Sequence, residues 1–407
     1  MSSTSAGARR RLLLALGLLP GVLLTAPAAS LAAWPGLDGR LSITQDQPGI
    51  NDDVYAFSRL GDDAQRLTLT RNDEEQSSWS PGGRLIAYKR SDEVFVRDVT
   101  TPDPPTRLTV KATSEIFNTQ PGWSPTGAQI VFRSNRAVPD TRAGDVWIMN
   151  ADGSDQRQLV FDDPGQVTDE RYPTLSPDGT RVLFTSDRTG SVGIWSADAR
   201  TGGDVRPIFD GPQADSAPAW APDGSRIAFE MHPPELATGG DVYTMRADGR
   251  RVRQLTTDPA HDEGPAWSPD GTMIAFTSER DEPLGDTWLM NADGSAQANL
   301  TRTPLLEESP DWQPLPFPDS VGRPGARRVV CGDLSLAKGG AASIQAVKVP
   351  CWKARWVARA WTAGARTGRF SCTSAPHSFD QVVVACDHKR KGLAFVYRLM
   401  EATATPE

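Results

Sequence analysis

The fold of this chain is decided by a stretch that reads Pro265-Ala266-Trp267-Ser268-Pro269-Asp270-Gly271-Thr272-Met273-Ile274-Ala275-Phe276. Its tryptophan recurs at Trp34, Trp79, Trp123, Trp220, Trp267 and Trp312, with Leu175 in the remaining position. Successive copies are separated by 45, 44, 52, 45, 47 and 45 residues. A period in the forties, with several short strands in each period, is typical of the blades of a β-propeller.

Each copy continues with turns and short apolar runs. The first turn recurs as Pro81-Gly82-Gly83, Pro125-Thr126-Gly127, Pro177-Asp178-Gly179, Pro222-Asp223-Gly224 and Pro269-Asp270-Gly271. Proline presets φ at the first corner, and we expect the glycine to take a positive φ. A second apolar run, such as 287–290, ends at a turn such as Asn291-Ala292-Asp293-Gly294, and a last short strand carries Leu300. The pattern predicts four antiparallel strands per period.

The repeated phrases Pro-x-Trp-Ser-Pro-Asp-Gly, Ile-Ala-Phe-x-Ser, Met-Asn-Ala-Asp-Gly and Leu-Thr resemble the TolB-type β-propeller repeat over about residues 34–314. The resemblance implies an extracytoplasmic scaffold, as in TolB, or a gating or substrate domain, as in related peptidases. The chain has no Gly-x-Ser-x-Gly motif, so we do not expect the hydrolase half of such peptidases. Propellers host unrelated activities, so the fold alone does not assign a function.

The spacing predicts an all-β fold with six blades of four antiparallel strands, followed by a small α+β disulfide-bonded domain. We expect the strand around Trp312 to complete the first blade and close the ring, because no further blade follows it. The predicted boundaries are a signal peptide at 1–32, the propeller at 33–314, a proline-rich linker at 315–322 and a small basic domain at 323–407.

The first 32 residues have the pattern of an export signal. Arg9, Arg10 and Arg11 precede an apolar run from Leu12 to Leu24, and small residues follow it. We therefore expect a secreted or extracytoplasmic protein, in the periplasm or at the cell surface. The three arginines leave general secretion and twin-arginine export as open alternatives.

Charge divides the chain sharply. The net charge is −8, with about +9 from residue 323 onward and about −20 over residues 34–322. An acidic propeller argues against nucleic acid as a partner. We expect an envelope or secreted protein to bind the propeller, and an anionic envelope polymer is a candidate partner for the basic domain.

The basic domain contains all four cysteines. In an exported chain these favour two disulfides, and of the three pairings we favour Cys331–Cys351 and Cys372–Cys386. A zinc site is the alternative, although no Cys-x-x-Cys spacing occurs. We predict strands near 328–331, 344–349, 370–372, 382–386 and 393–397, and a helix from Cys351 to Trp361. One face of that helix carries Trp352, Trp356 and Arg359, a candidate partner surface unless the rest of the protein covers it.

Two repeated polar sets are candidate binding residues at one mouth of the propeller channel. The acidic set comprises Glu74, Glu75, Asp169, Glu170, Asp215, Asp262, Glu263, Glu307 and Glu308. A ring of carboxylates there would attract a basic peptide or a cation such as Ca²⁺, although acidic loop tips also serve solubility. The basic set comprises Arg136, Arg188 and Arg280, which either contact a ligand or pair with nearby acids that open the third strands.

The sequence shows no catalytic or metal-binding motif, and we expect no cofactor beyond a channel-bound cation. The four histidines, His232, His261, His377 and His388, are scattered, and we interpret them as solvated loop residues. The resulting hypothesis is a non-catalytic binding or scaffold protein of the cell envelope. The alternatives are a polysaccharide lyase or glycosidase that uses mouth carboxylates as acid and base, and a carbohydrate- or cation-binding module.

Overall fold

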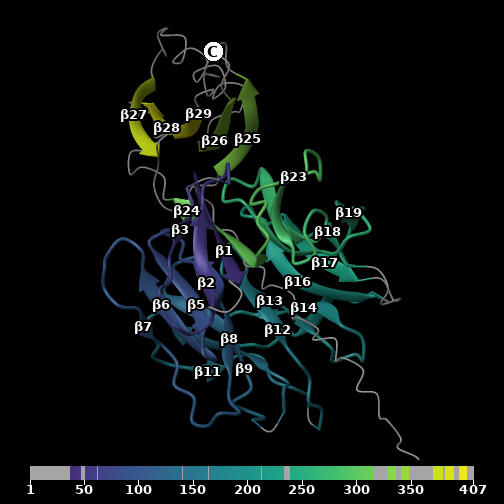
Figure 1. The fold of residues 1–407 in the computed structure, drawn as a ribbon. Coiled ribbons are helices and arrows are strands. Elements are labelled where there is room, and N and C mark those ends of the chain that lie inside the picture. Colours follow the sequence, from purple (N-terminus) through teal and green to yellow (C-terminus); the bar gives the residue numbers. More distant parts are fainter. Residues whose placement is uncertain are drawn as a thin grey trace, which may run out of the picture.

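The structure is a computed structural model that describes residues 37–315, except 47–50, 62, 140, 164, 212 and 233–238, and five strands between residues 328 and 400. Residues 37–315 form six four-stranded antiparallel sheets arranged as the blades of a propeller (Figure 1). The first strand of each sheet contacts the first strand of the next, and β20 contacts β24. These six inner strands therefore surround the axis, which confirms the predicted architecture.

In every blade the inner strand is followed outwards by three further strands. Blade one contains β24 (Leu306–Leu315), β1 (Leu37–Asp46), β2 (Asp52–Phe57) and β3 (Gln65–Arg66). Blade two contains β4 (Glu74–Trp79), β5 (Leu85–Arg90), β6 (Glu93–Asp98) and β7 (Thr106–Arg107). Blade three contains β8 (Asn118–Trp123), β9 (Gln129–Ser134), β10 (Asp145–Asn150) and β11 (Arg157–Gln158).

The second half of the ring follows the same plan. Blade four contains β12 (Arg171–Leu175), β13 (Arg181–Ser186), β14 (Gly193–Asp198) and β15 (Arg206–Phe209). Blade five contains β16 (Ala214–Trp220), β17 (Arg226–His232), β18 (Asp241–Arg246) and β19 (Arg253–Gln254). Blade six contains β20 (Asp262–Trp267), β21 (Met273–Ser278), β22 (Asp286–Asn291) and β23 (Ala298–Asn299).

The ring is closed by β24, which pairs antiparallel with β1 in blade one. Trp312 lies opposite Leu41, and Asp311 lies opposite Ser42. Strands from the two ends of the propeller thus share one sheet, and the edge of β1 is covered. This confirms the prediction that the Trp312 strand completes the first blade.

The repeated turns and tryptophans have the backbone conformation and the burial that the sequence predicts. The glycines of the Pro-x-Gly turns have positive φ, for example 66° at Gly83 and 72° at Gly271. Trp79, Trp267 and their equivalents are buried between blades. The indole nitrogen of Trp123 donates a 3.1 Å hydrogen bond to the Ser78 carbonyl of the preceding blade, so packing and hydrogen bonding both hold neighbouring blades together.

Every inner strand contains a bulge at the same position of the repeat. The backbone there has φ between 48° and 58° at Gln76, Gln120, Tyr172, Ala217, Gly264 and Ser309. The register of the inner strand shifts at the same place in each blade. A bulge bends the strand and re-aims the side chains beside it. It thereby separates the polar residues that begin the inner strand from the apolar ladder that follows.

The described strands after the propeller are β25 (Arg328–Ser335), β26 (Ala341–Val347), β27 (Phe370–Ser378), β28 (Gln381–His388) and β29 (Ala394–Met400). They form one antiparallel sheet in the order β25-β26-β29-β28-β27, so all five predicted strands are present. The predicted helix, with Cys351, Trp352, Trp356 and Arg359, lies outside the described residues, as do the predicted signal peptide and most of the linker. No helix in the described part of the chain is long and apolar enough to cross a membrane.

Candidate functional site

Six equivalent side chains at the start of the inner strands form a buried row between blades. They are Glu74, Asn118, Glu170, Asp215, Asp262 and Glu307, and each is fully buried. The expectation that these acids stand in open loops at the channel mouth is therefore wrong for the five carboxylates of this row. Each directly precedes a strand or is one of its first two residues, so none stands in an open loop.

Several of these buried carboxylates accept hydrogen bonds from neighbouring groups of the protein. Glu307 accepts bonds from Gln45 at 2.8 Å and from the Thr287 amide at 3.0 Å. Glu74 accepts a 2.6 Å bond from the Thr70 hydroxyl. Asp215 accepts a 3.2 Å bond from the Gly211 amide, and burial raises its pKa to about 7. These contacts position the loops that join the blades.

Two of the three repeated arginines form ion pairs with carboxylates of this buried row. Arg188 donates to Glu170 at 2.9 Å, and Arg280 donates to Asp262 at 2.5 Å. Both guanidinium groups also stack on aromatic rings of their own blade. Local pairing is thus confirmed for these two residues. Arg136 is different, because the equivalent inner-strand residue is Asn118.

Arg136 instead donates to Gln156 at 2.6 Å and stacks on Phe132 and Trp147. Of the two alternatives for these arginines, pairing with an acid does not hold for Arg136, since the third blade lacks the carboxylate at this position. Two of its guanidinium nitrogens, Nε and Nη2, are buried without a hydrogen-bond partner. Burial accordingly lowers its pKa.

The next residues of the inner strands form a second row, made of Glu75, Thr119, Arg171, Ser216, Glu263 and Glu308. Glu75 binds Lys89 at 3.0 Å. Asp169, just before its strand, binds Arg133 at 2.6 Å and Arg171 at 2.5 Å. The predicted acidic ring is therefore interrupted by Thr119, Arg171 and Ser216, and its negative charge gathers on one side of the axis.

That side carries a group of carboxylates that we call the acidic cluster: Asp46, Asp52, Asp73, Glu75 and Glu308. Burial, together with the charges of Glu263, Glu75, Asp52 and Asp46, raises the pKa of Glu308 to about 8. Burial and the neighbouring carboxylates Glu75, Asp46 and Asp73 raise the pKa of Asp52 to about 7. One oxygen each of Asp52, Asp73 and Glu75 lies within 4.8 Å of the other two. These three residues offer the oxygen ligands that Ca²⁺ prefers.

A second group lies between blades five and six and was not foreseen. It comprises Glu230, His232, His261 and Glu263, and we call it the histidine cluster. The imidazole centroids of His232 and His261 are 5.4 Å apart. The interpretation of these two histidines as scattered, solvated loop residues is wrong, because β17 and the start of β20 bring them together. The signal was a departure from the repeat, since Met231-His232-Pro233 stands where blades three, four and six have Ser-x-Arg.

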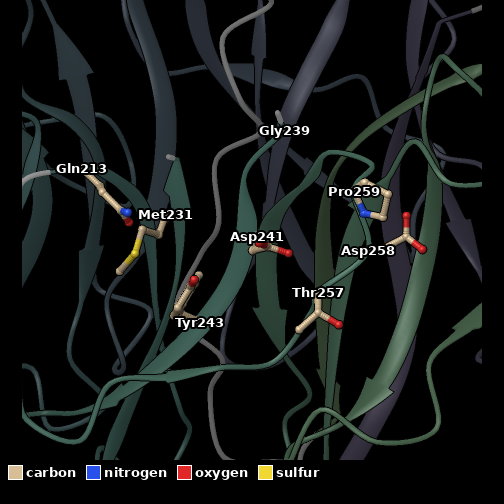
Figure 2. A pocket seen from close by; sticks show the side chains of 8 residues that line it. All are labelled: Gln213, Met231, Gly239, Asp241, Tyr243, Thr257, Asp258 and Pro259. Carbon is tan, nitrogen blue, oxygen red and sulfur yellow. The ribbon is translucent and has the colours of Figure 1, made fainter. Parts of the chain in front are cut away.

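A pocket of about 240 Å³ lies near this second group (Figure 2). Met231 lines it and follows Glu230 in β17, so its side chain faces the other side of the sheet. Figure 2 shows Asp241 between Met231 on one side and Thr257 and Asp258 on the other. Asp241 accepts a 2.9 Å bond from Gln254, so this carboxylate is already engaged.

Comparison with known proteins agrees with this geometry. Residues 205–315 match the TolB beta propeller domain family, PD40. The chain is 29% identical over 171 residues to an uncharacterized protein of Agrobacterium fabrum, a match that covers 38% of this chain and 54% of the relative. It is 30% identical over 117 residues to the uncharacterized peptidase YuxL of Bacillus subtilis, which covers 28% of this chain and 17% of the peptidase. The matches thus span about half of one curated relative and a small part of the other.

Among solved structures, TolB from Acinetobacter baumannii superposes with a TM-score of 0.58 and 22% identity over 68% of this chain and 67% of that chain. Identity at this level shows a common fold and does not transfer a partner or an activity. The repeats, the blade closure and the family match agree with one another. Residues 205–315 therefore match the TolB beta propeller domain family, PD40, and residues 37–315 fold as a six-bladed, TolB-like β-propeller.

Proposed function

We propose that the protein is a non-catalytic binding protein of the cell envelope or extracellular space, and that its acidic cluster engages a cationic segment of a protein partner. The observation that carries this proposal is Glu308, whose pKa rises to about 8 through burial and the charges of carboxylates from three blades. Such crowding is relieved by protons or by a bound positive charge. The extracytoplasmic location rests on the predicted signal peptide, and the likeness to TolB supports it.

The charges at this site are only partly compensated within the protein. Lys89 binds Glu75, whereas the charges of Glu75, Asp46 and Asp73 all act on Asp52. A lysine- or arginine-rich segment would bring several positive charges to a concentrated negative field, which favours fast and salt-sensitive association. A Ca²⁺ ion at Asp52, Asp73 and Glu75 would compete with such a segment for the same oxygens.

A synthetic octalysine peptide tests the proposal on the full-length mature chain. We expect fluorescence anisotropy to show binding that weakens with salt. The double variant Glu75→Gln, Glu308→Gln should lower the affinity at least about tenfold, since it removes two carboxyl groups that could ionise against the bound cation. The matched control is Asp293→Asn, in the turn after β22 at the opposite end of the blade, which should bind like the wild type. Equal affinities of all three proteins would overturn the proposal.

Asp52 and Glu308 also support a second candidate function, that of a polysaccharide lyase or glycosidase. Carboxyl groups with raised pKa beside ionised carboxylates can serve as general acid and base. The test is incubation of the protein with acidic and neutral polysaccharides, followed by detection of new reducing ends. If the protein is such an enzyme, Glu308→Gln should abolish turnover. If it is a binding protein, the wild type should form no product with any of these polysaccharides.

A further inference from the structure

We propose that the histidine cluster is a binding site for a divalent transition metal, with Zn²⁺ as the best fit. The site uses Glu230, His232 and His261 as ligands, and Glu263 is placed to supply a fourth. It goes beyond the proposed function, because its donor set and its ligand differ from those of the acidic cluster.

Strand geometry assembles the donors from two blades. Glu230 and His232 are two residues apart in β17, so their side chains project from the same face. His261 and Glu263 have the same spacing at the start of β20. The Glu279 amide donates a 3.0 Å bond to the His261 carbonyl, which fixes the backbone of this histidine.

The donor atoms lie close enough for one ion. Nε2 of His232 contacts Oε1 of Glu230, and Nε2 of His261 lies 3.9 Å from the same oxygen. Nε2 of His261 also lies 3.1 Å from Oε2 of Glu263. One donor atom each from Glu230, His232 and His261 falls within 4.8 Å of the other two. Zinc–ligand bonds of about 2.0–2.2 Å require a modest adjustment of this set, in which the contact between His232 and Glu230 opens to admit the ion.

The environment of Glu230 provides independent support for a bound cation. The Glu230 side chain is fully buried, its Oε1 contacts the His232 imidazole, and its Oε2 has no hydrogen-bond partner. A buried carboxylate is costly unless a positive charge compensates it. Glu263 adds a second negative charge beside it. A divalent cation between the two carboxylates balances both charges, and the two imidazoles favour zinc over Ca²⁺ or Mg²⁺.

The backbone beside the imidazoles is built from two glycines. A Cβ atom at Gly240 would lie 3.1 Å from Nδ1 of His232 and 3.2 Å from Cε1 of His261. A Cβ atom at Gly239 would lie 2.3 Å from Cα of His261, so a larger residue cannot occupy this position without a shift. The glycines therefore allow the chain to pass directly against both rings.

Metal binding at His261 should also move the backbone amide of Gly240. Its amide donates a 2.6 Å bond to Nδ1 of His261, which leaves Nε2 as the protonated nitrogen of the neutral ring. A metal at Nε2 takes the place of that proton, and Nδ1 then carries one. The Gly240 amide must turn away from Nδ1, a rotation that the glycine pair permits. Faster amide exchange at Gly240 is the expected signature.

The experiment titrates the metal-free, full-length mature protein with Co²⁺ and then with Zn²⁺. We expect one equivalent of Co²⁺ to give the visible absorption of a four- or five-coordinate complex, which Zn²⁺ then removes. Glu230→Gln and His232→Asn should each weaken Zn²⁺ binding at least about tenfold. The matched controls are His377→Asn, in β27, and Glu75→Gln, in the acidic cluster, and both should bind like the wild type.

Zinc K-edge X-ray absorption of the wild-type protein makes the proposal testable even if a variant fails to fold. The expected first shell contains only nitrogen and oxygen, with at least two imidazoles. Sulfur ligands, or a thiolate-to-cobalt charge-transfer band, would assign the metal to the cysteines of the basic domain and overturn the proposal. It would also be overturned by loss of binding in His377→Asn, or by unchanged binding in Glu230→Gln.

Discussion

Oδ2 of Asp311 accepts a 2.8 Å hydrogen bond from the backbone amide of Trp79, 232 residues earlier in the chain. The bond joins the closing strand β24 of blade one to β4 of blade two. Asp311 is only 4% exposed, and burial raises its pKa to about 8 although the amides of Trp79 and Trp312 favour the charged form. The closure of the ring therefore contains an acid that is most stable when protonated.

This acid makes the stability of the propeller depend on pH. An unfolded aspartate has a pKa of about 3.9. Because the folded-state pKa is higher, the contribution of Asp311 is fully present below about pH 4 and is lost as the pH rises to about 8, by up to about 1.4 kcal/mol per pH unit. Asp311→Asn keeps an oxygen acceptor but cannot ionise. We expect this variant to melt at a higher temperature than the wild type, and the difference should grow as the pH rises from about 5 to about 8. A difference that does not change with pH would contradict this.

Closure by β24 also predicts how truncation acts. Deletion of residues 309–407 removes most of β24, leaves β1 without its partner and exposes sheet edges. We expect this protein to unfold or aggregate, whereas deletion of residues 319–407 should leave a folded propeller. Size-exclusion chromatography and thermal melting of the two truncated proteins distinguish the cases. The closure argument fails if both melt alike.

The fold was predictable because each period repeats the same turn residues and the same pattern of apolar residues. A tryptophan, a Pro-x-Gly turn and two apolar runs determine a blade, and five clear copies in register outweigh the weakness of each motif. The closing strand was predictable for the same reason, since Trp312 has no blade of its own. The bulge at Gln76 and its equivalents was not, because these positions share a backbone conformation and not a residue type.

The candidate sites were predictable only in part. The repeat identified Glu74 and Glu75 together, but strand alternation and the bulge bury the first and leave the second near the axis. Sequence spacing could not show which acids would crowd Glu308, since Asp46 and Glu263 come from different blades. The histidine cluster was missed because His232 and His261 are distant in sequence and neither belongs to the repeat. Glu230-x-His232 and His261-x-Glu263, both at strand spacing, were the available signal.

The pair between Arg188 and Glu170 should contribute strongly to stability. The guanidinium is 6% exposed and the carboxylate is fully buried, so removing one partner leaves a buried charge. Glu170→Gln should lower the free energy of unfolding by about 3–5 kcal/mol. The matched control is Asp204→Asn, which breaks the 2.6 Å pair of Arg181 with a carboxylate that is 58% exposed. That change should cost about 0–1 kcal/mol. Chemical denaturation measures both, and equal losses would refute the distinction.

The cysteine pairing predicted from sequence has a structural counterpart in the sheet after the propeller. The backbone register places Cys372 directly opposite Cys386 in the ladder between β27 and β28. Opposed residues in an antiparallel ladder have Cα atoms about 4.5–5.5 Å apart, within the range that a disulfide spans. We therefore expect a Cys372–Cys386 disulfide, which leaves Cys331 to pair with Cys351.

Peptide mapping by mass spectrometry, on non-reduced protein expressed in an oxidising compartment, should yield these two linked peptides and no alkylatable thiol. The double variant Cys372→Ser, Cys386→Ser should retain the Cys331–Cys351 link and lose about 2–5 kcal/mol of stability in this sheet. A matched change away from the cysteines, Ser374→Ala in the same strand, controls for the substitution itself. A peptide that links Cys331 to Cys372 or to Cys386 would contradict the pairing, because the opposed cysteines could not then be joined to each other. Quantitative alkylation of the native protein would contradict oxidation as a whole.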